Sequence, residues 1–197
     1  MARMPSAERR RQLVEAAVRV MARDGVARAT TRAICAEAEV SLSVFHYCFD
    51  SKQELLEAAI GSITGTYVAR VMSAVEPRAT LRETVRAALG TYWDHVTEHP
   101  AEHMLTYELT QYALREEGFE RLARAQYEQY VASAVVLVEQ VCAVRGIAPK
   151  VPVELVARVL AATIDGLTLQ YLVLGDDRAA EALLDATADH LVALVEG

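Results

Sequence analysis

Apolar residues recur every three or four positions along nearly the whole chain, which is the period of amphipathic helices and not of strands. In the first such segment, Ser6 is a helix N-cap and Gly25 supplies the left-handed residue that ends the helix. Beyond Pro77, proline and glycine breaks separate longer helices, expected at 79–98, 101–116, 117–145, 152–174 and 177–195. The pattern predicts an all-α protein of about nine helices.

Two short helices lie between the first helix and the longer ones. Thr30 and Thr31 cap a helix over 32–38, and Ser41 caps the next, which closes at Phe49. Ser51-Lys52-Gln53-Glu54 is a capping box that starts a fourth helix, ended by Pro77. This helix, tight turn and helix predict a helix-turn-helix, whose second helix enters the major groove and needs about two turns to do so.

In the second short helix, Phe45 and Phe49 are four residues apart and are expected to anchor it to the first two helices. The remaining side chains would then face the DNA groove or its walls: Leu42, Ser43, Val44, His46, Tyr47 and Cys48.

Composition supports a large buried core, because 53% of the 197 residues are hydrophobic and 24% are charged. The longest charge-free stretch, Ala58 to Ala69, has 12 residues and is too short to cross a bilayer. No apolar core follows the basic residues of the N-terminus, so we expect no secretory signal. The three cysteines have no metal-ligand spacing. These features predict a cytoplasmic protein with reduced, mostly buried thiols, no membrane contact, no metal and no cofactor.

Charge is distributed unevenly along the chain, although the net charge is −7. Residues 1–53 carry nine Lys/Arg and six Asp/Glu, whereas residues 54–197 carry eleven and twenty-one. A small basic module followed by an acidic body fits a nucleic-acid-binding head, and a solvated basic face explains it equally well.

The segment Gly25 to Ile60, GVARATTRAICAEAEVSLSVFHYCFDSKQELLEAAI, resembles the TetR family of bacterial transcriptional repressors. The resemblance rests on an ordered set of positions: Gly25, Thr30-Thr31, Ile34, Ala38, Val40-Ser41, Phe45, Phe49 and Ser51-Lys52-Glu54-Leu55-Leu56. It implies a DNA-binding transcriptional regulator, in which a small molecule bound to a helical body releases the head from double-stranded operator DNA. It also implies a homodimer formed through the last two helices.

Carried over by position, the resemblance implies that Thr31, Arg32 and Lys52 contact the DNA backbone. It places Leu42, Ser43, Val44 and Cys48 toward the bases, and His46 at the family's phosphate-binding tyrosine position, with Tyr47 as an adjacent substitute. Glu39 stands where the family usually has glycine, at an expected left-handed turn position. Because Leu42 and Val44 are aliphatic, readout would depend on thymine methyls and groove shape.

Basic residues before and within the first helix, Arg3 and Arg9–Arg11, have two interpretations. They neutralise DNA phosphates or lie along a minor groove, or they are a solvated helix start with no fixed contact.

The resemblance also implies a division into a DNA-binding domain (1–51), a connecting helix (52–76) and a ligand-binding and dimerisation domain (77–197). Aromatic and histidine residues gather at 92–130, where we expect the effector site, with polar groups added from the penultimate helix. The predicted lining is Trp93, Tyr107, Gln111, Tyr127, Asp165 and Gln170, although an aromatic stripe at helical spacing is more often core. Apolar faces on the last two helices fit a four-helix dimer interface or intrachain core.

Two other functions stay open from the sequence: an enzyme built on a helical bundle, and a helical adaptor that has lost specific DNA binding. No GxSxG, HExxH or phosphate-binding glycine loop supports the first. His95, His99 and His103 follow at intervals of four, but Pro100 interrupts them, so they need not share a face or bind metal.

Overall fold

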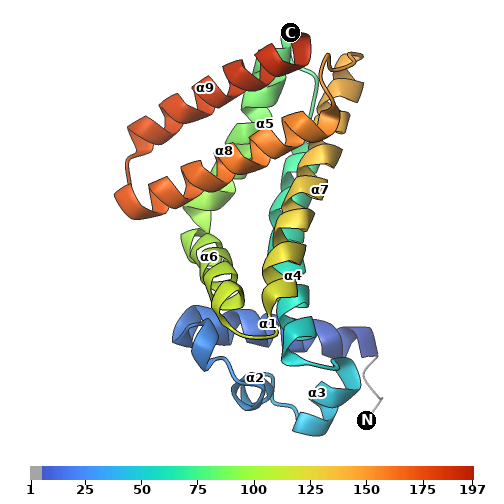
Figure 1. The fold of residues 1–197 in the computed structure, drawn as a ribbon, viewed down its shortest axis with the longest axis vertical. Coiled ribbons are helices and arrows are strands. Elements are labelled where there is room, and N and C mark those ends of the chain that lie inside the picture. Colours follow the sequence, from blue (N-terminus) through green and yellow to red (C-terminus); the bar gives the residue numbers. More distant parts are fainter. Residues whose placement is uncertain (1–5) are drawn as a thin grey trace. The chain divides into compact units, whose positions relative to one another are not determined.

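In the computed structural model, which describes residues 6–197 apart from the side chain of residue 120, the chain is all-helical, as predicted (Figure 1). Within those residues it has nine α-helices, one 3₁₀ turn and no strand. They divide between two compact units, residues 1–64 with 101–127 and residues 65–100 with 128–197. We call these unit 1 and unit 2.

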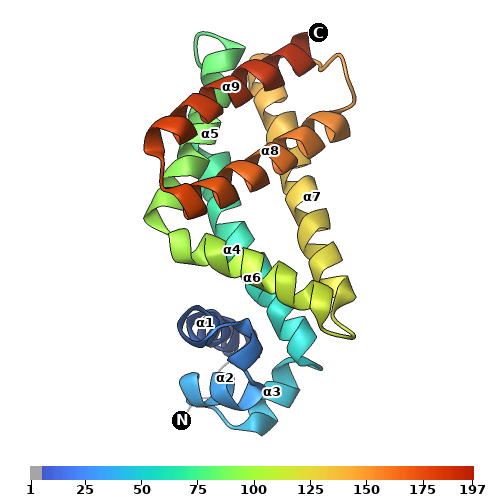
Figure 2. The same ribbon diagram turned by 60° about the vertical axis from the view of Figure 1, so that its left-hand side comes forward.

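Unit 1 begins with α1 (Ser6–Asp24), the 3₁₀ turn η1 (Val26–Arg28), α2 (Thr31–Glu37) and α3 (Leu42–Cys48). It also contains the first part of α4 (Lys52–Ala74), all but the first residue of α6 (Pro100–Arg115), and the start of α7 (Glu120–Arg145). Both α2 and α3 pack against α1, and in Figures 1 and 2 they lie on the same side of it. Helix α2 begins and ends one residue earlier than the range 32–38 predicted from the sequence.

The core of unit 1 forms where the apolar stripes of these helices meet. Leu13, Ala17 and Met21 of α1 are almost fully buried, as is Ile34 of α2. Phe45 and Phe49 are each 1% exposed and join the same cluster, which confirms their predicted role as anchors of the second short helix. The same core includes Leu105 and Leu109 of α6, so α6 belongs to the body that contains the two short helices.

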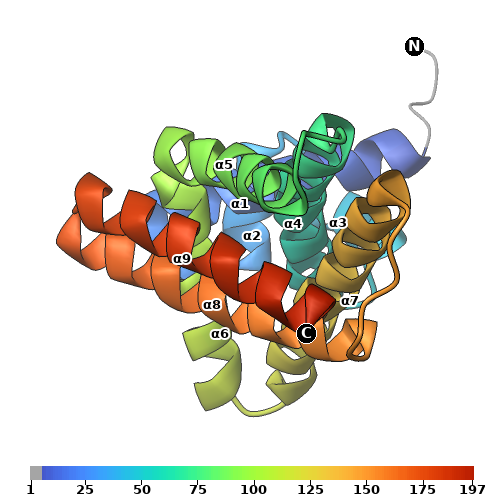
Figure 3. The same ribbon diagram turned by 90° about the horizontal axis from the view of Figure 1, so that it is seen from above.

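Unit 2 consists of the rest of α4 and α7 together with α5 (Leu81–Glu98), α8 (Val153–Leu174) and α9 (Asp177–Glu196). A complete capping box at Thr80 and Glu83 begins α5, and Gly175 in the left-handed conformation ends α8. Helix α9 packs against both α8 and α5, and Figure 3 shows α8 and α9 running side by side. Arg82 and Arg86 on α5 form ion pairs with three acidic residues of α9, Glu181, Asp185 and Asp189.

One helix of unit 2, α8, is long and apolar enough to span a membrane by length and composition alone. Its most apolar window is only 28% buried inside the structure, and within the described residues it is the single helix that meets these criteria. Much of the apolar surface of α8 is therefore exposed within this unit.

Candidate DNA-reading surface and effector region

The turn between α2 and α3 has the geometry of a Schellman motif. The N–H of Val40 donates to the carbonyl of Cys35 at 2.9 Å, and the N–H of Glu39 donates to that of Ala36 at 3.1 Å. This motif needs a left-handed residue, and Glu39 has φ 53°, the single positive φ outside glycine among the described residues. The expected left-handed turn position is confirmed, and a glutamate occupies it at some cost in backbone strain.

Helix α3 has two opposite faces. Leu42 and His46, and likewise Ser43 and Tyr47, are four residues apart and all four are exposed, so they form one open face. Val44 is half-buried at the edge of this face and packs against the core. We call Leu42, Ser43, His46 and Tyr47 the reading face; Tyr47, 65% exposed, protrudes most.

Cys48 does not belong to the reading face, which corrects the prediction that it faces DNA. It is 8% exposed and lies in the core of unit 1 with Phe45, the residue three positions before it. Residues three apart on a helix share a face, so the buried side that holds Phe45 also takes Cys48.

Helix α1 fixes the end of α2 through side chains. Gln12 donates from Nε2 to the carbonyl of Ala38 at 2.8 Å. The carboxylate of Glu37 accepts from Arg19 and from Arg23, at 2.9 Å each. Hydrogen bonds from these two guanidinium groups hold the pKa of Glu37 below its ordinary value.

Arg10 of α1 holds the other end of the motif, where α3 passes into α4. Its guanidinium donates to the carbonyl of Cys48 at 2.6 Å, lies 4.1 Å from the centre of the Phe49 ring, and forms an ion pair with Glu54 at 2.8 Å. Arg10 is therefore engaged inside the protein. Its neighbours also have protein partners, because Arg9 donates to Gln12, and Arg11 forms ion pairs with Glu8 and Glu15. Arg3 lies outside the described residues.

The cap at the start of α4 differs in one bond from the predicted box. Ser51 Oγ accepts from the N–H of Glu54 at 3.1 Å, as expected. The Glu54 carboxylate, however, accepts from the N–H of Asp50 at 2.8 Å and not from that of Ser51. The backbone bond from Asp50 and then the bond from Arg10 hold the pKa of Glu54 below its ordinary value. Glu54 thus connects the α3–α4 junction to the backbone at Asp50 and to Arg10 of α1.

The first turn of α2 contains two of the predicted phosphate contacts. Thr30 is the N-cap, with its side chain accepting from the N–H of Ala33 at 3.1 Å, so Thr31 is the first helical residue. Thr31 is half-buried and Arg32 is exposed.

Lys52 is placed differently from the other predicted phosphate contacts. Its ammonium group lies 5.0 Å from the centre of the Tyr112 ring on α6, and the residue is half-buried. Burial lowers the pKa of Lys52, and the nearby Glu116 carboxylate acts in the opposite direction. Helix α6 also contacts the turn before α2, where Glu108 Oε1 accepts from the N–H of Val26 at 2.7 Å. Sequence periodicity gave no signal for either contact, because both depend on tertiary packing.

The six predicted effector residues fall into both units. Trp93, Asp165 and Gln170 are in unit 2, whereas Tyr107, Gln111 and Tyr127 are in unit 1. Trp93 is buried, with the ring of Tyr171 4.8 Å away in an edge contact. Asp165 and Tyr107 are half-buried, and Gln111, Gln170 and Tyr127 are exposed.

Inside unit 2, polar and aromatic side chains from three helices meet around Tyr92 and Tyr67. The Tyr92 hydroxyl of α5 hydrogen-bonds Thr168 Oγ1 of α8 at 3.0 Å, and the Tyr92 ring lies 5.5 Å from that of Tyr67 on α4. The ring of the buried His95 lies 5.7 Å from that of Tyr67. Burial raises the pKa of Tyr92; the hydrogen bond with Thr168 acts in the opposite direction, and the charges of Tyr130 and Asp165 raise it further.

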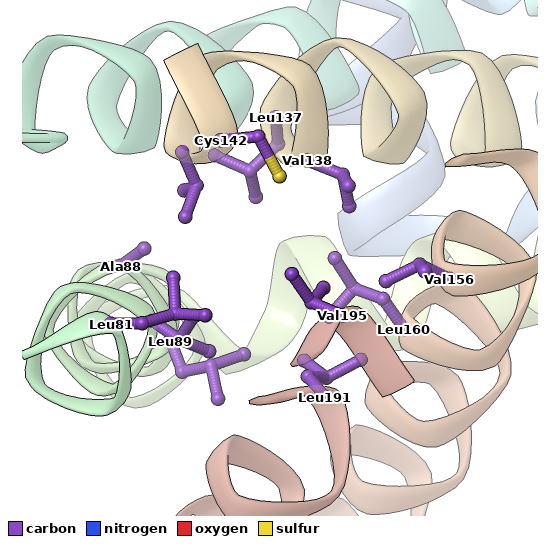
Figure 4. Close-up of a pocket in the computed structure, with 12 residues that line it drawn as sticks. Leu81, Ala88, Leu89, Leu137, Val138, Cys142, Val156, Leu160, Leu191 and Val195 are labelled. Carbon is purple, nitrogen blue, oxygen red and sulfur yellow. The ribbon is translucent and has the colours of Figure 1, made fainter. Parts of the chain in front are cut away.

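An apolar cavity of about 40 Å³ lies elsewhere in unit 2, between α5, α7, α8 and α9 (Figure 4). Its lining is aliphatic apart from Cys142, whose pKa is raised by burial. None of the predicted effector residues lines it. Drug-sized ligands occupy pockets of about 300–1,000 Å³, so this cavity is too small for such an effector.

Metal binding has no support in the described part of the chain, where no group of three His, Cys, Asp or Glu residues is suitably placed. The rings of His95 and His99 lie 4.7 Å apart in unit 2, whereas His103 is buried in unit 1.

In this all-helical chain, α2, a tight turn and α3 with one exposed face are packed on a common core. This is the arrangement of helix-turn-helix DNA-binding proteins. Family comparison makes this specific. Residues 13–59 match the family described as bacterial regulatory proteins, tetR family, and residues 77–196 match the C-terminal domain of the BetI-type transcriptional repressors. The chain belongs to the TetR family and is a ligand-responsive, DNA-binding transcriptional regulator, not an enzyme.

Full-length relatives agree with this assignment. The chain is 29% identical over 187 residues to the nicotine-responsive transcriptional repressor HdnoR of Paenarthrobacter nicotinovorans, covering 95% of each protein. It is 29% identical over 186 residues to the transcriptional regulator BetI of Rhizobium meliloti (strain 1021), covering 93% of this chain and 87% of BetI. The crystal structure of the multidrug binding protein EbrR complexed with imidazole superposes with a TM-score of 0.66 at 28% identity, covering 93% of this chain and 89% of that one.

Proposed function

We propose that the protein is a repressor whose reading face occupies the major groove of its operator and is released by a small organic effector. The observation that carries the proposal is the division of α3, with four exposed residues on one side and Phe45, Cys48 and Phe49 buried on the other. A helix anchored in this way presents one turn to base edges, which is the part that a recognition helix uses.

In this proposal Tyr47 and His46 contact phosphate or base edges, and Leu42 and Ser43 contact the bases. Thr31 and Arg32 bind phosphate from the start of α2, while Lys52 does so only if its ammonium group leaves the Tyr112 ring. The three regions proposed from the sequence are the DNA-binding part (1–51), the connecting helix (52–76) and the ligand-binding and dimerisation part (77–197).

DNA binding is tested with the intergenic DNA upstream of the protein's own gene, titrated by fluorescence anisotropy over a range of salt concentrations. Arg32→Ala removes one proposed phosphate contact from each protomer, two from the proposed homodimer, so the slope of log K against log salt should fall in magnitude by about 1.8. Arg78→Ala removes an exposed arginine that lies before α5, outside the helices of the proposed DNA and dimer contacts, and is the matched control, with an unchanged slope expected. If the wild-type protein binds this DNA no better than unrelated DNA, and no other genomic fragment is enriched, the repressor proposal is wrong.

The effector proposal draws on the relatives. HdnoR is nicotine-responsive and EbrR was crystallised with imidazole, so a small nitrogen-containing organic molecule is a reasonable effector for this chain as well. Of the predicted lining, Trp93 and Asp165 lie in unit 2, and we propose that they belong to an effector site within this unit. Tyr107, Gln111, Tyr127 and Gln170 stay predictions.

We further propose that the active species is a cytoplasmic homodimer formed through α8 and α9. Leu155, Leu169 and Val173 follow one stripe of α8 and are 46%, 43% and 70% exposed. Leu183 of α9 is 40% exposed, whereas Leu184, Leu191 and Val195 are buried inside the chain. The predicted apolar faces therefore divide between intrachain core and an uncovered surface. A partner copy explains this surface and the apolar character of α8 without a membrane.

A further inference from the structure

Helix α6 directs one stripe of side chains at the helix-turn-helix part of unit 1. Glu108, Tyr112 and Glu116 follow at intervals of four. The N–H of Glu116 donates to the carbonyl of Tyr112 at 3.0 Å, so the helical spacing continues past the last residue of α6. Glu108 accepts from the N–H of Val26 before α2, and the Tyr112 ring lies against the ammonium group of Lys52 at the start of α4.

The Tyr112 ring is held in place within unit 1. The ring of Phe119 contacts it edge-on, with the two centres 5.4 Å apart. One turn before Tyr112, Glu108 lies so close to the turn before α2 that a Cβ on Gly25 would be 3.0 Å from its Oε1. The ring is therefore fixed beside Lys52 and does not follow the ammonium group if that group moves.

Lys52 has its contacts on α6. Within the described residues it forms no ion pair, and its ammonium group lies 5.0 Å from the centre of the Tyr112 ring. Burial lowers the pKa of Lys52, and the charge of the exposed Glu116 carboxylate raises it. Lys52 is half-buried in this position, whereas Arg32, the other cation among the proposed phosphate contacts, is exposed. Lys52 therefore has to leave α6 before it can reach a phosphate.

We propose that Tyr112, assisted by Glu116, is a positioning residue that holds the Lys52 ammonium group away from DNA and thereby lowers the affinity for the operator. The aromatic ring and a DNA phosphate compete for one cation, so the free energy of the cation–π contact is subtracted from that of DNA binding. By linkage, DNA that takes up Lys52 also weakens its contact with α6. This inference rests on the proposed function, since it takes Lys52 as a phosphate contact.

Lysine resonances give a direct assay, because the chain has two lysines, Lys52 and the exposed Lys150. Reductive methylation with isotope-labelled formaldehyde marks both amines and keeps their positive charge, and Lys150→Arg assigns the two signals. The ring current of Tyr112 should shift the methyl protons of Lys52 upfield, and Tyr112→Leu should remove this shift. Saturation with operator DNA should remove it in the wild type as well, while the Lys150 signal stays in place.

Operator affinity measures the consequence for DNA binding. Tyr112→Leu removes the competing ring from both protomers of the proposed homodimer. A cation–π contact at a partly exposed site corresponds to about two- to fivefold per protomer, so operator binding should tighten by about 4- to 25-fold. Tyr112→Phe keeps an aromatic face and should stay close to the wild type. In a Lys52→Gln background Tyr112→Leu should have no effect, whereas a merely structural role of Tyr112 would change the affinity in both backgrounds.

A second pair of variants tests the contact without altering the packing of Tyr112. Glu116→Gln removes the carboxylate that attracts Lys52 toward α6. Glu117→Gln makes the same change in charge one residue further along, also at an exposed position. Operator binding by Glu116→Gln should be about two- to fivefold tighter than binding by Glu117→Gln. If Tyr112→Leu does not fold, this pair and the wild-type Lys52 resonance still decide the question.

The inference is overturned if Lys52 keeps its upfield shift in the operator complex, or if Tyr112→Leu binds the operator no more tightly than the wild type. It is also overturned if the gain persists in the Lys52→Gln background, or if Glu116→Gln and Glu117→Gln bind equally. In each of these cases operator binding by the wild type is unaffected, and the repressor function is kept. A wild-type protein that binds no operator overturns the repressor function, and the inference with it, even where the Lys52 resonance shows the contact with Tyr112.

Discussion

Glu39 is a strained residue at the one point of the helix-turn-helix where glycine would be unstrained. A left-handed conformation costs a residue with a Cβ about 1–2 kcal/mol, and glycine loses about 0.4–1 kcal/mol of this advantage through its more flexible unfolded state. Glu39 is exposed, and its backbone N–H donates to Ala36 in either case. Glu39→Gly should therefore stabilise the protein by up to about 1 kcal/mol, a rise of about 2–4 °C in Tm.

Differential scanning calorimetry measures this effect, and Glu39→Ala is the control. Alanine removes the same carboxylate but keeps the Cβ, so it should give no such gain. Equal Tm values for the glycine and alanine variants would show that the backbone at this turn is not strained.

The roles of individual charged residues were the least predictable part of the site. The sequence predicted Lys52 as a DNA contact and left Arg10 as either a phosphate contact or a solvated side chain. In the structure Arg10 binds Cys48 and Glu54, and Lys52 lies against Tyr112. The sequence shows that a positively charged side chain is present. It does not show which group that side chain contacts, because the contacting residue is distant in sequence. Cys48 was misplaced for a different reason: every residue of this helix other than the two phenylalanines was assigned to the DNA side, although Cys48 is three residues from Phe45 and shares its face.

At the scale of elements, the helices and their ends follow closely from periodicity and caps, because these signals are local. The end of α8 at Gly175 is an example, whereas α5 begins at Leu81, two residues later than the expected 79, after a cap at Thr80. The grouping of α6 with the first three helices could not be read from the sequence, because it depends on the packing of Leu105 and Leu109 and on the bond between Glu108 and Val26.

The junction between α3 and α4 should respond to acid. The pKa of Glu54 is lowered in the folded protein by the Asp50 N–H and by Arg10, so the ionised carboxylate stabilises the fold. That stabilisation is fully present above the carboxyl's ordinary pKa of 4.5 and is lost as the pH falls through the lowered folded value. Stability should therefore decrease on acidification below about pH 5.

Urea midpoints at pH 7 and pH 4 measure this dependence. Glu54→Gln should lower the midpoint at pH 7 and make the difference between the two pH values smaller. Glu57→Gln, an exposed glutamate of the same helix, is the control and should leave the difference unchanged. A pH dependence that is identical in Glu54→Gln and the wild type would remove Glu54 from this role, leaving Glu37, whose pKa is lowered by Arg19 and Arg23, as a contributor.

For the whole molecule, the proposed homodimer determines whether a short reading helix is sufficient to recognise an operator. One α3 helix of seven residues contacts few base pairs, whereas two helices related by a two-fold axis address two half-sites together. The uncovered stripe of α8, with Val173 at 70% exposure, is the surface through which we expect the two copies to associate. Val173→Asp places a charge on this stripe without entering the core of either unit, so it should separate the copies while the fold is kept.

Analytical ultracentrifugation should then give a mass near 21.6 kDa for Val173→Asp and twice that value for the wild type. Val136→Asp, the same change at a valine of α7 that is 49% exposed, should stay dimeric. Because a monomer loses the second half-site, operator affinity should fall by about 100-fold or more in Val173→Asp and little in Val136→Asp. A Val173→Asp protein that stays dimeric with full operator affinity would place the interface elsewhere. A monomer with full affinity would show that one reading face is sufficient for recognition.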